Sequence, residues 1–268
     1  MLDSLSGGFL PRLLPRNFCR KRKIRWENRL LADYDQIVLM ESSRQHHKVC
    51  SQNEDWYPKA RFLDIPALCH VERQPTTSAD ETITMCFVGT MAEGVRTPYA
   101  FLSTVARIPD VNIKIIFAGQ NGCHALESYV ENAENISVEH VGMVPYEQAQ
   151  QLLCRADFLI NLGNTSACMV PSKIFEYMSY GKPILSTYRM DDDSSLPYLR
   201  KYPASFLMDE RNSNDAEEAT RLREFILHNR KTAIPYESVA DQLYANTPGA
   251  FYELLCQQEK GDFNEEVE

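Results

Sequence analysis

The 268-residue sequence predicts an α/β fold built on a doubly wound parallel sheet. Short apolar runs rich in Ile, Val and Phe recur along the chain, and such continuous runs indicate strands that are covered on both faces. The runs are 83–88, 113–118, 136–141, 158–162 and 184–187, and a glycine follows each of the first four. Helical patterns alternate with them at 97–107, 124–133, 146–155 and 172–180. This alternation predicts right-handed crossovers and a ligand site at the carboxyl ends of the strands.

The segment 170–183, V-P-S-K-I-F-E-Y-M-S-Y-G-K-P, predicts a short helix that carries a cation and a carboxylate. Pro171 suits the first helical position and Gly181 suits the left-handed residue that ends a helix, which gives a helix of about three turns. Three residues share its outward face: Lys173, Glu176 and Tyr180.

The start of this helix has the chemistry of a phosphate site. Its unpaired amides and the helix dipole favour an anion, and Lys173 adds a full positive charge. Glu176, one turn deeper, can accept hydrogen bonds from sugar hydroxyls. The segment therefore predicts a nucleotide diphosphate site. A solvated amphipathic helix is the alternative, but the four glycines at strand ends favour a site because they allow a ligand to approach the backbone closely.

Four segments resemble one family. They are F-V-G-T-M-A-E-G-V-R at 87–96, H-V-G-M-V-P-Y-E-Q-A-Q-Q-L-L at 140–153, A-D-F-L-I-N-L at 156–162 and P-S-K-I-F-E-Y-M-S-Y-G-K-P at 171–183. In this order they resemble the C-terminal, donor-binding domain of GT-B glycosyltransferases, within the large retaining group (glycosyl transferases group 1) that uses nucleotide diphosphate sugars. The resemblance implies a Rossmann-like doubly wound parallel sheet, with a partial second Rossmann-like domain.

The resemblance also implies roles for residues of the donor site. Glu176 would hydrogen-bond the ribose hydroxyls, while Lys173 and the amides of the helix start at Ser172 would face the diphosphate. Arg96, seven residues after Gly89, would contact the phosphates, to which an arginine can bind in a bidentate manner. A surface arginine at the start of a helix is the alternative.

Two further parts of the donor site follow from the resemblance. Thr90 stands where the family usually has an arginine directly after the glycine of the first strand, so it belongs to the same phosphate loop. Gly142 and Val144 lie in the turn that would supply backbone groups to the base.

One departure from the family concerns the transferred sugar. The family commonly has two glutamates separated by seven residues, and the position that pairs with Glu176 is a cysteine here. Either other groups hold the sugar or the site is impaired. The candidates are Asn164, Thr165, Ser166 and Cys168, although polar residues in such a loop are also common turn formers. No residue is assigned to catalysis.

A second departure concerns size, because a complete GT-B enzyme has two Rossmann-like domains and 268 residues hold little more than one. The predicted regions are a residual acceptor-side part at 1–70, a linker at 71–81, the nucleotide-sugar-binding domain at 82–210, C-terminal helices that cross back at 211–257 and an acidic tail at 258–268. We therefore expect a truncated form, or a chain whose acceptor domain is a separate polypeptide.

The regions outside the donor domain have their own predicted elements. These are helices at 26–32, 43–49, 216–229 and 236–256, and strands at 36–40 and 61–65. His46 and His47 lie on the second of these helices, where a core or surface role fits them better than catalysis. The acidic run Asp191 to Asp193 is interpreted as a solvated turn that caps a helix at 194–201, with metal binding as the alternative.

The resemblance implies a hexosyltransferase-type enzyme. It would move a sugar from a nucleotide diphosphate sugar to an acceptor hydroxyl of a glycan or lipid-linked acceptor, in glycan, glycolipid or cell-surface polysaccharide synthesis. Phosphate contacts would stabilise the leaving diphosphate, with no metal ion or other cofactor expected. A non-catalytic nucleotide-sugar-binding subunit or remnant is the alternative, and a flavodoxin-like regulatory domain is a third interpretation. The base, sugar, acceptor, linkage and stereochemical outcome stay open.

Composition limits the partners and the compartment. The net charge of −9 argues against nucleic acid, and eight cysteines without C-x-x-C spacing indicate a reducing cytoplasm. No apolar stretch approaches the roughly 20 residues of a membrane span. From Arg12 to Arg25 the sequence has seven basic residues and no acidic one. A solvated helix is the favoured interpretation of this segment, and peripheral contact with anionic lipid at the inner face of the membrane is the alternative.

Overall fold

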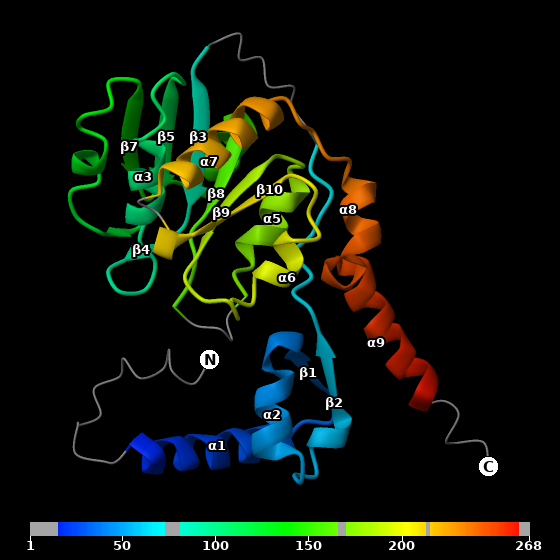
Figure 1. Ribbon diagram of the computed structural model, residues 1–268. Helices are drawn as coiled ribbons and strands as arrows, with labels where there is room; N and C mark the ends of the chain where they lie inside the picture. Colours follow the sequence, from blue (N-terminus) through cyan, green and yellow to red (C-terminus); the bar gives the residue numbers. More distant parts are fainter. Residues whose placement is uncertain (1–15, 73–80, 166–169, 213–214, 263–268) are drawn as a thin grey trace. The chain divides into compact units, whose positions relative to one another are not determined.

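The computed structural model describes residues 16–72, 81–165, 170–212 and 215–262, and the chain divides into two compact units. Unit 1 comprises Met1–Pro66 and Gly249–Glu268, and unit 2 comprises Ala67–Pro248. Figure 1 shows the elements of each unit.

A six-stranded parallel sheet forms the centre of unit 2. Its strands are β3 (Ile83–Val88), β5 (Ile113–Ala118), β7 (Ile136–Gly142), β8 (Phe158–Asn161), β9 (Ile184–Tyr188) and β10 (Ser205–Asp209). Their order is β10-β9-β8-β3-β5-β7, which is the doubly wound order of a Rossmann-like domain. The predicted fold class is confirmed. Strand β10 was not predicted, because its residues are only alternately buried and do not form a continuous apolar run.

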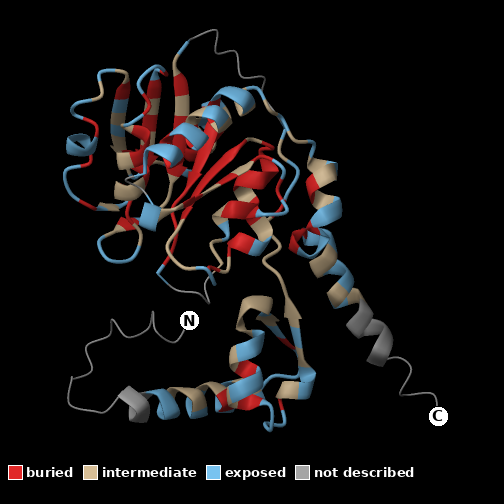
Figure 2. Ribbon diagram, in the orientation of Figure 1, coloured by how far each residue is buried: buried red, intermediate tan, exposed pale blue. Residues whose placement is uncertain are grey.

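Helices of unit 2 cover both faces of this sheet. They are α3 (Tyr99–Val105), α4 (Tyr146–Arg155), α5 (Lys173–Ser179), α6 (Leu196–Leu199), α7 (Ala216–Asn229) and α8 (Tyr236–Gln242). Side chains of α3 and α7 pack with Ile83, Met85 and Phe87 of β3 in one apolar core. Alternate residues of a strand point to opposite faces, so Cys86 lies buried on the other face. Figure 2 shows the central strands as buried and the outer sides of the helices as exposed.

One predicted helix of unit 2 is wrong. The segment 124–133 contains only the 3-10 turn η4 (Glu127–Tyr129), and Ala125 has a φ of +50°, which interrupts a right-handed helix. The helical pattern arose because Leu126 and Val130 are both buried, as residues four apart on one face of a helix would be. The connection between β5 and β7 is therefore mostly irregular.

Short elements complete unit 2. They are the paired strands β4 (Met91–Ala92) and β6 (Asn121–Gly122) and the 3-10 turns η5 (Glu210–Asn212) and η6 (Tyr244–Asn246). The helix predicted at 236–256 is divided, since η6 separates α8 from α9 (Pro248–Asp262). Pro248 explains the break, because proline suits the first turn of a helix and not its interior.

Unit 1 is built on a parallel pair of strands, β1 (Ile37–Met40) and β2 (Ala60–Leu63). The other elements before residue 66 are α1 (Arg16–Ala32), η2 (Glu41–Ser43), α2 (Arg44–Ser51) and η3 (Tyr57–Lys59). Trp56 and His47 are buried here with their rings in edge-to-face contact, 5.6 Å between centroids. Both predicted strands and both predicted helices are present, with α1 longer than expected.

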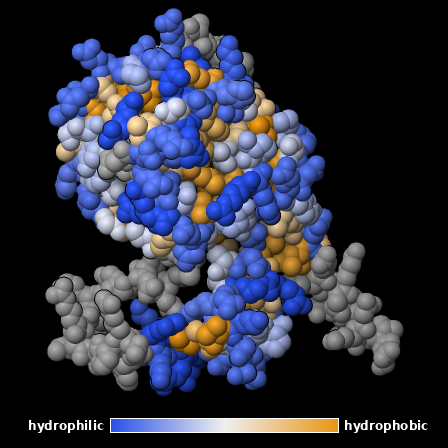
Figure 3. Space-filling model, viewed as in Figure 1, coloured by the Kyte–Doolittle hydropathy of each residue, from blue (hydrophilic) through white to orange (hydrophobic). Residues whose placement is uncertain are grey.

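The surface of the molecule is mixed in character. On the face drawn in Figure 3, hydrophilic residues cover most of unit 2, and apolar residues form small patches between them. Within the described ranges, every helix is too short or too polar to cross a membrane. The segment from Arg12 to Arg25 lies partly outside the described residues, so both interpretations of it, a solvated helix and lipid contact, stay predictions.

Candidate functional site

The sheet of unit 2 has one point where its strand order reverses, between β3 and β8. The chain leaves β3 toward β5 on one side and leaves β8 toward β9 on the other, so the loops after these two strands diverge. In doubly wound sheets the ligand crevice is expected at the carboxyl ends of these two strands. The loop after β3 carries Gly89, Thr90 and Arg96, and the loop after β8 carries Asn164 and Thr165. Sequence prediction and topology therefore point to the same edge of the sheet.

The helix α5 follows the second of these loops and differs in detail from the prediction. It has seven residues and begins at Lys173, with Ser172 as its N-cap, so Pro171 precedes the helix instead of occupying its first turn. Gly181 has a φ of +62°, which confirms it as the left-handed residue after the helix. Two of the three residues expected on the outward face, Lys173 and Glu176, are partly exposed.

The third residue expected on that face, Tyr180, is buried. Its exposed fraction is 4%, and burial raises the pKa of its hydroxyl. Tyr180 is the C-cap of α5 and keeps helical dihedral angles, with φ −74° and ψ −12°. The prediction failed because the chain covers this side of the helix as well, and Tyr177, on the same side, is also buried.

Lys173 and Glu176 form an ion pair on α5. Lys173 Nζ lies 2.5 Å from Glu176 Oε2, and both side chains keep contact with solvent, at 38% and 25% exposure. The i, i+3 spacing brings them together. The pair presents hydrogen-bond donors and carboxylate acceptors side by side, which suits a ligand with phosphate oxygens and hydroxyls.

A buried tyrosine attaches α5 to the end of β3. The hydroxyl of Tyr177 accepts a hydrogen bond from the amide of Val88 at 3.0 Å and lies 3.3 Å from its carbonyl oxygen. Tyr177 is 1% exposed, and burial strongly raises its pKa, so it remains a neutral hydroxyl. This contact fixes the helix that carries Lys173 and Glu176 relative to the glycine loop. Tyr177 was not among the predicted site residues, although the polar tip of a tyrosine among apolar helix residues was a usable signal.

Arg96 joins the two loops of the crevice. Its guanidinium donates to Asn164 Oδ1 through Nε at 3.1 Å and through a second, shorter hydrogen bond from Nη2. Burial lowers the pKa of Arg96, and the electrostatic influence of Tyr177 and Asp193 opposes the shift. The structure thus places a predicted phosphate residue against a predicted sugar residue, 68 positions apart in the chain.

Glycines at the strand ends allow the loops to approach one another. The amide of Gly89 donates to Ala118 O, and the amide of Gly119 donates to Gly142 O. A Cβ on Gly119, whose φ is +124°, would lie 2.0 Å from Gly89 O, so a side chain cannot fit there. Gly142 has a φ of +72°, and Val144, two residues later, is partly exposed at the same end of the sheet.

A buried network of polar side chains from the ends of β9 and β10 anchors the loop after β8. Thr187 Oγ1 accepts from the amide of Gly163 at 2.9 Å and donates to Glu210 Oε1 at 2.7 Å. Arg189 forms an ion pair with Glu210 and also donates to Thr97 Oγ1. The sequence analysis did not single out these residues. Their signal was the presence of polar side chains directly at the ends of β9 and β10.

The remaining predicted positions have different surroundings. Thr90, Thr165 and Ser172 are exposed. Ser166 and Cys168 lie outside the described residues, so their proposed contact with the sugar stays a prediction.

The acidic run is not a wholly solvated turn. Asp191 is exposed and pairs with Arg211, but Asp193 is 4% exposed and its Oδ1 accepts from the amide and hydroxyl of Ser195. Asp193 therefore caps the turn that leads into α6 from a buried position. The predicted helix at 194–201 is reduced to α6.

Residues 82–219 match the family described as Glycosyl transferases group 1, and the match covers more than half of the chain. The chain belongs to this family. Every predicted residue of the donor site lies within the matched region. No curated protein matches the sequence.

Solved structures agree on the fold at low sequence identity. The lipopolysaccharide outer core galactosyltransferase WaaB has a TM-score of 0.57 and 13% identity, with 93% of this chain and 82% of that chain covered. Anabaena Alr3699/HepE, solved with UDP and glucose, has a TM-score of 0.55 and 14% identity, with 88% of this chain and 67% of HepE covered. WaaG, a glycosyltransferase involved in lipopolysaccharide biosynthesis, has a TM-score of 0.53 and 14% identity. The superposition covers 80% of this chain and 58% of WaaG. The GT-B resemblance is thereby confirmed for the fold.

Proposed function

We propose that unit 2 binds a nucleotide diphosphate sugar at the crevice between β3 and β8, and that the protein transfers its glycosyl group to an acceptor hydroxyl of a glycan or lipid-linked acceptor. The observation that carries the proposal is the Lys173–Glu176 pair on α5, which directly follows the loop that Arg96 joins to the end of β3. Membership of the glycosyl transferases group 1 family and the UDP complex of the similar HepE support it.

The charges of the site suit the two ends of such a donor. Arg96 and Lys173 are cations that can neutralise a diphosphate, both as it binds and as it leaves with the bonding electrons of the broken glycosidic bond. The carboxylate of Glu176 can accept hydrogen bonds from the two hydroxyls of a ribose. Asn164, which accepts hydrogen bonds from Arg96 and is 5% exposed, is the proposed contact for the transferred sugar. No step assigned to these residues requires a metal ion.

Calorimetric titration with UDP, GDP and UDP-glucose tests donor binding. Glu176→Gln keeps the size of the side chain but removes its charge, so we expect affinity for the nucleotide to fall about 10- to 100-fold. Glu224→Gln, on the exposed face of α7, is the matched control and should leave affinity unchanged. Absence of binding by all three ligands, or equal affinity of the two variants, would contradict the proposal.

A transfer assay separates the enzyme from a non-catalytic subunit that binds the same nucleotide sugar. The expected result is that radiolabelled sugar moves from the bound donor to a glycan or lipid-linked acceptor and that Arg96→Gln slows the transfer. Tight donor binding with no transfer to any acceptor class would favour the binding subunit.

A further inference from the structure

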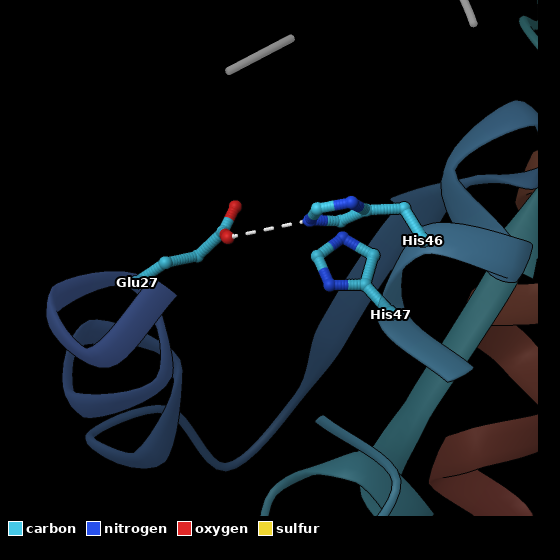
Figure 4. A group of neighbouring side chains, drawn as sticks. All are labelled: Glu27, His46 and His47. Atoms are coloured by element: carbon cyan, nitrogen blue, oxygen red, sulfur yellow. Dashed lines mark ion pairs between the residues drawn. The ribbon is translucent and has the colours of Figure 1, made fainter. Parts of the chain in front are cut away.

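Two histidines and a glutamate of unit 1 converge without hydrogen-bonding to one another. Glu27 extends from α1, and His46 and His47 extend from α2, toward one space, as Figure 4 shows. One ligand atom from each residue lies within 4.8 Å of the other two. Glu27 Oε2 is 3.9 Å from His46 Nε2, and the two imidazole centroids are 5.1 Å apart at an angle of 79°.

One imidazole nitrogen of each histidine is buried without a hydrogen-bond partner. The two atoms are His46 Nε2 and His47 Nδ1, and His47 as a whole is 4% exposed. Buried polar atoms are nearly always hydrogen-bonded in folded proteins, so two unpaired nitrogens in adjacent residues need an explanation. A cation that accepts their lone pairs supplies one.

The two helices are held in place beside this group by a separate contact. Asn28 follows Glu27 on α1 and is 6% exposed, and its Oδ1 accepts from the hydroxyl of Ser51 on α2 at 2.8 Å. Its Nδ2 donates to Glu54 at 2.9 Å. This bridge sets the spacing of α1 and α2 without using the histidines. Consecutive helical residues normally do not face each other, so the approach of the two rings is a product of this packing.

From this geometry we propose that Glu27, His46 and His47 bind a divalent transition-metal ion, with Zn²⁺ as the best fit. Two imidazoles and one carboxylate are a ligand set that zinc accepts, and a water molecule can complete four-coordination. At usual zinc bond lengths two ligand atoms lie about 3.3 Å apart. The Glu27–His46 separation of 3.9 Å therefore needs to close by about half an ångström, and the widest separation of the group, up to 4.8 Å, by up to about 1.5 Å. Magnesium and calcium are disfavoured because they prefer oxygen ligands.

The surroundings of the group give the proposed ion an apolar second layer. The ring of His47 packs edge-on against Trp56, with 5.6 Å between centroids, and is tilted toward Phe62 at 6.2 Å. Glu27 and His46 retain 30% and 28% exposure of their side chains, which leaves a path for an ion from solvent. All three ligands belong to unit 1, so the ion is a site separate from the donor residues of unit 2.

Zinc alone is the probe for the binding test. After equilibration with Zn²⁺ and gel filtration, the full chain is expected to retain one ion per molecule, and competition with a chromophoric chelator gives its affinity. Glu27→Gln and His46→Asn each remove one ligand from a partly exposed position and should weaken binding at least about tenfold. His124→Asn changes an exposed histidine outside the group and is the control.

Cobalt provides a second readout at the same site. Co²⁺ is expected to give visible ligand-field absorption and to quench the fluorescence of Trp56, whose ring contacts His47, in the wild type but not in His46→Asn. Circular dichroism confirms that each variant is folded. Retention of no Zn²⁺ by the wild type, or equal affinity of Glu27→Gln, His46→Asn and His124→Asn, overturns the proposal.

Discussion

Unit 1 and unit 2 both contain parallel strands, but they bury them differently. In unit 2, six strands lie between helices, and central residues such as Phe158 and Ile160 have no exposed area. In unit 1, two strands are paired, and Val38 and Met40 of β1 are 39% and 47% exposed. Because parallel strands are normally covered on both faces, unit 2 has the packing expected of a stable domain and unit 1 has less of it.

Both units contain buried polar atoms without a hydrogen-bond partner, but the atoms differ in kind and position. In unit 2 the buried hydroxyls of Thr187 and Tyr177 have hydrogen-bond partners within the protein. Among the described residues of unit 2, three other buried side-chain atoms have none, namely Asp193 Oδ2, Ser194 Oγ and Glu218 Oε1. In unit 1 His46, His47 and Trp56 each have a buried nitrogen without a partner. The unpaired atoms in the described part of unit 1 are all nitrogens of neighbouring rings, and the proposed metal ion would bind the two that belong to histidines.

The largest expected effect comes from the glycine loops of unit 2. Gly119→Ala places a Cβ 2.0 Å from Gly89 O in a backbone conformation that alanine avoids, so we expect a loss of at least about 3 kcal/mol of unfolding free energy, or failure to fold. Gly94→Ala also has a positive φ but has no atom within 4 Å, and should lose only about 1 kcal/mol. Urea denaturation followed by circular dichroism measures both. If the two variants lost equal unfolding free energy, the contact of Gly119 with Gly89 would not be as close as the structure gives it.

The next effect tests whether the two units unfold separately. Both tryptophans of the chain, Trp26 and Trp56, belong to unit 1, so tryptophan fluorescence reports on that unit alone. Phe158→Ala should lower the stability of unit 2 by about 3–5 kcal/mol and shift the circular dichroism transition, while the fluorescence transition stays in place. Leu227→Ala, at a residue 51% exposed on α7, is the control. Coincident shifts of both signals would mean that the units unfold as one.

A smaller effect is expected in the buried polar network. Thr187→Val preserves shape but removes the acceptor for Gly163 N and the donor to Glu210, so unit 2 should lose about 1–3 kcal/mol. Thr220→Val removes a hydroxyl that bonds a helix carbonyl at an exposed position and should change stability by less than about 0.5 kcal/mol. Thermal unfolding of the two variants gives the difference, and a neutral Thr187→Val would show that the network does not support the loop.

The smallest expected effect is a difference in reactivity between two cysteine thiols of the unmodified protein. Burial raises the pKa of Cys86 to about 12, so its reactive thiolate is scarce in the folded protein at about pH 8. We expect iodoacetamide to label the exposed Cys69 quickly and Cys86 only after denaturant is added. Peptide mass spectrometry over time distinguishes the two. Rapid labelling of Cys86 would show that the sheet of unit 2 opens readily.

Much of unit 2 could be predicted from local sequence. The bounds of α4 and α7 agree with the predicted helices at 146–155 and 216–229, because their apolar periodicity coincides with their buried faces. The segment 124–133 has similar periodicity but no α-helix, since Leu126 and Val130 are buried by a chain that turns at Ala125. The spacing of apolar residues in a sequence indicates which residues are buried. It does not indicate whether an α-helix or an irregular chain buries them.

The sequence by itself determined the doubly wound fold class and the presence of Lys173 and Glu176 on one side of a short helix, because both depend on spacing within a few residues. Only the tertiary structure decided the contact of Arg96 with Asn164, the attachment of Tyr177 to β3 and the convergence of Glu27 with His46 and His47. These contacts join residues from different elements, and their geometry depends on how whole strands and helices pack. Local spacing cannot encode that packing.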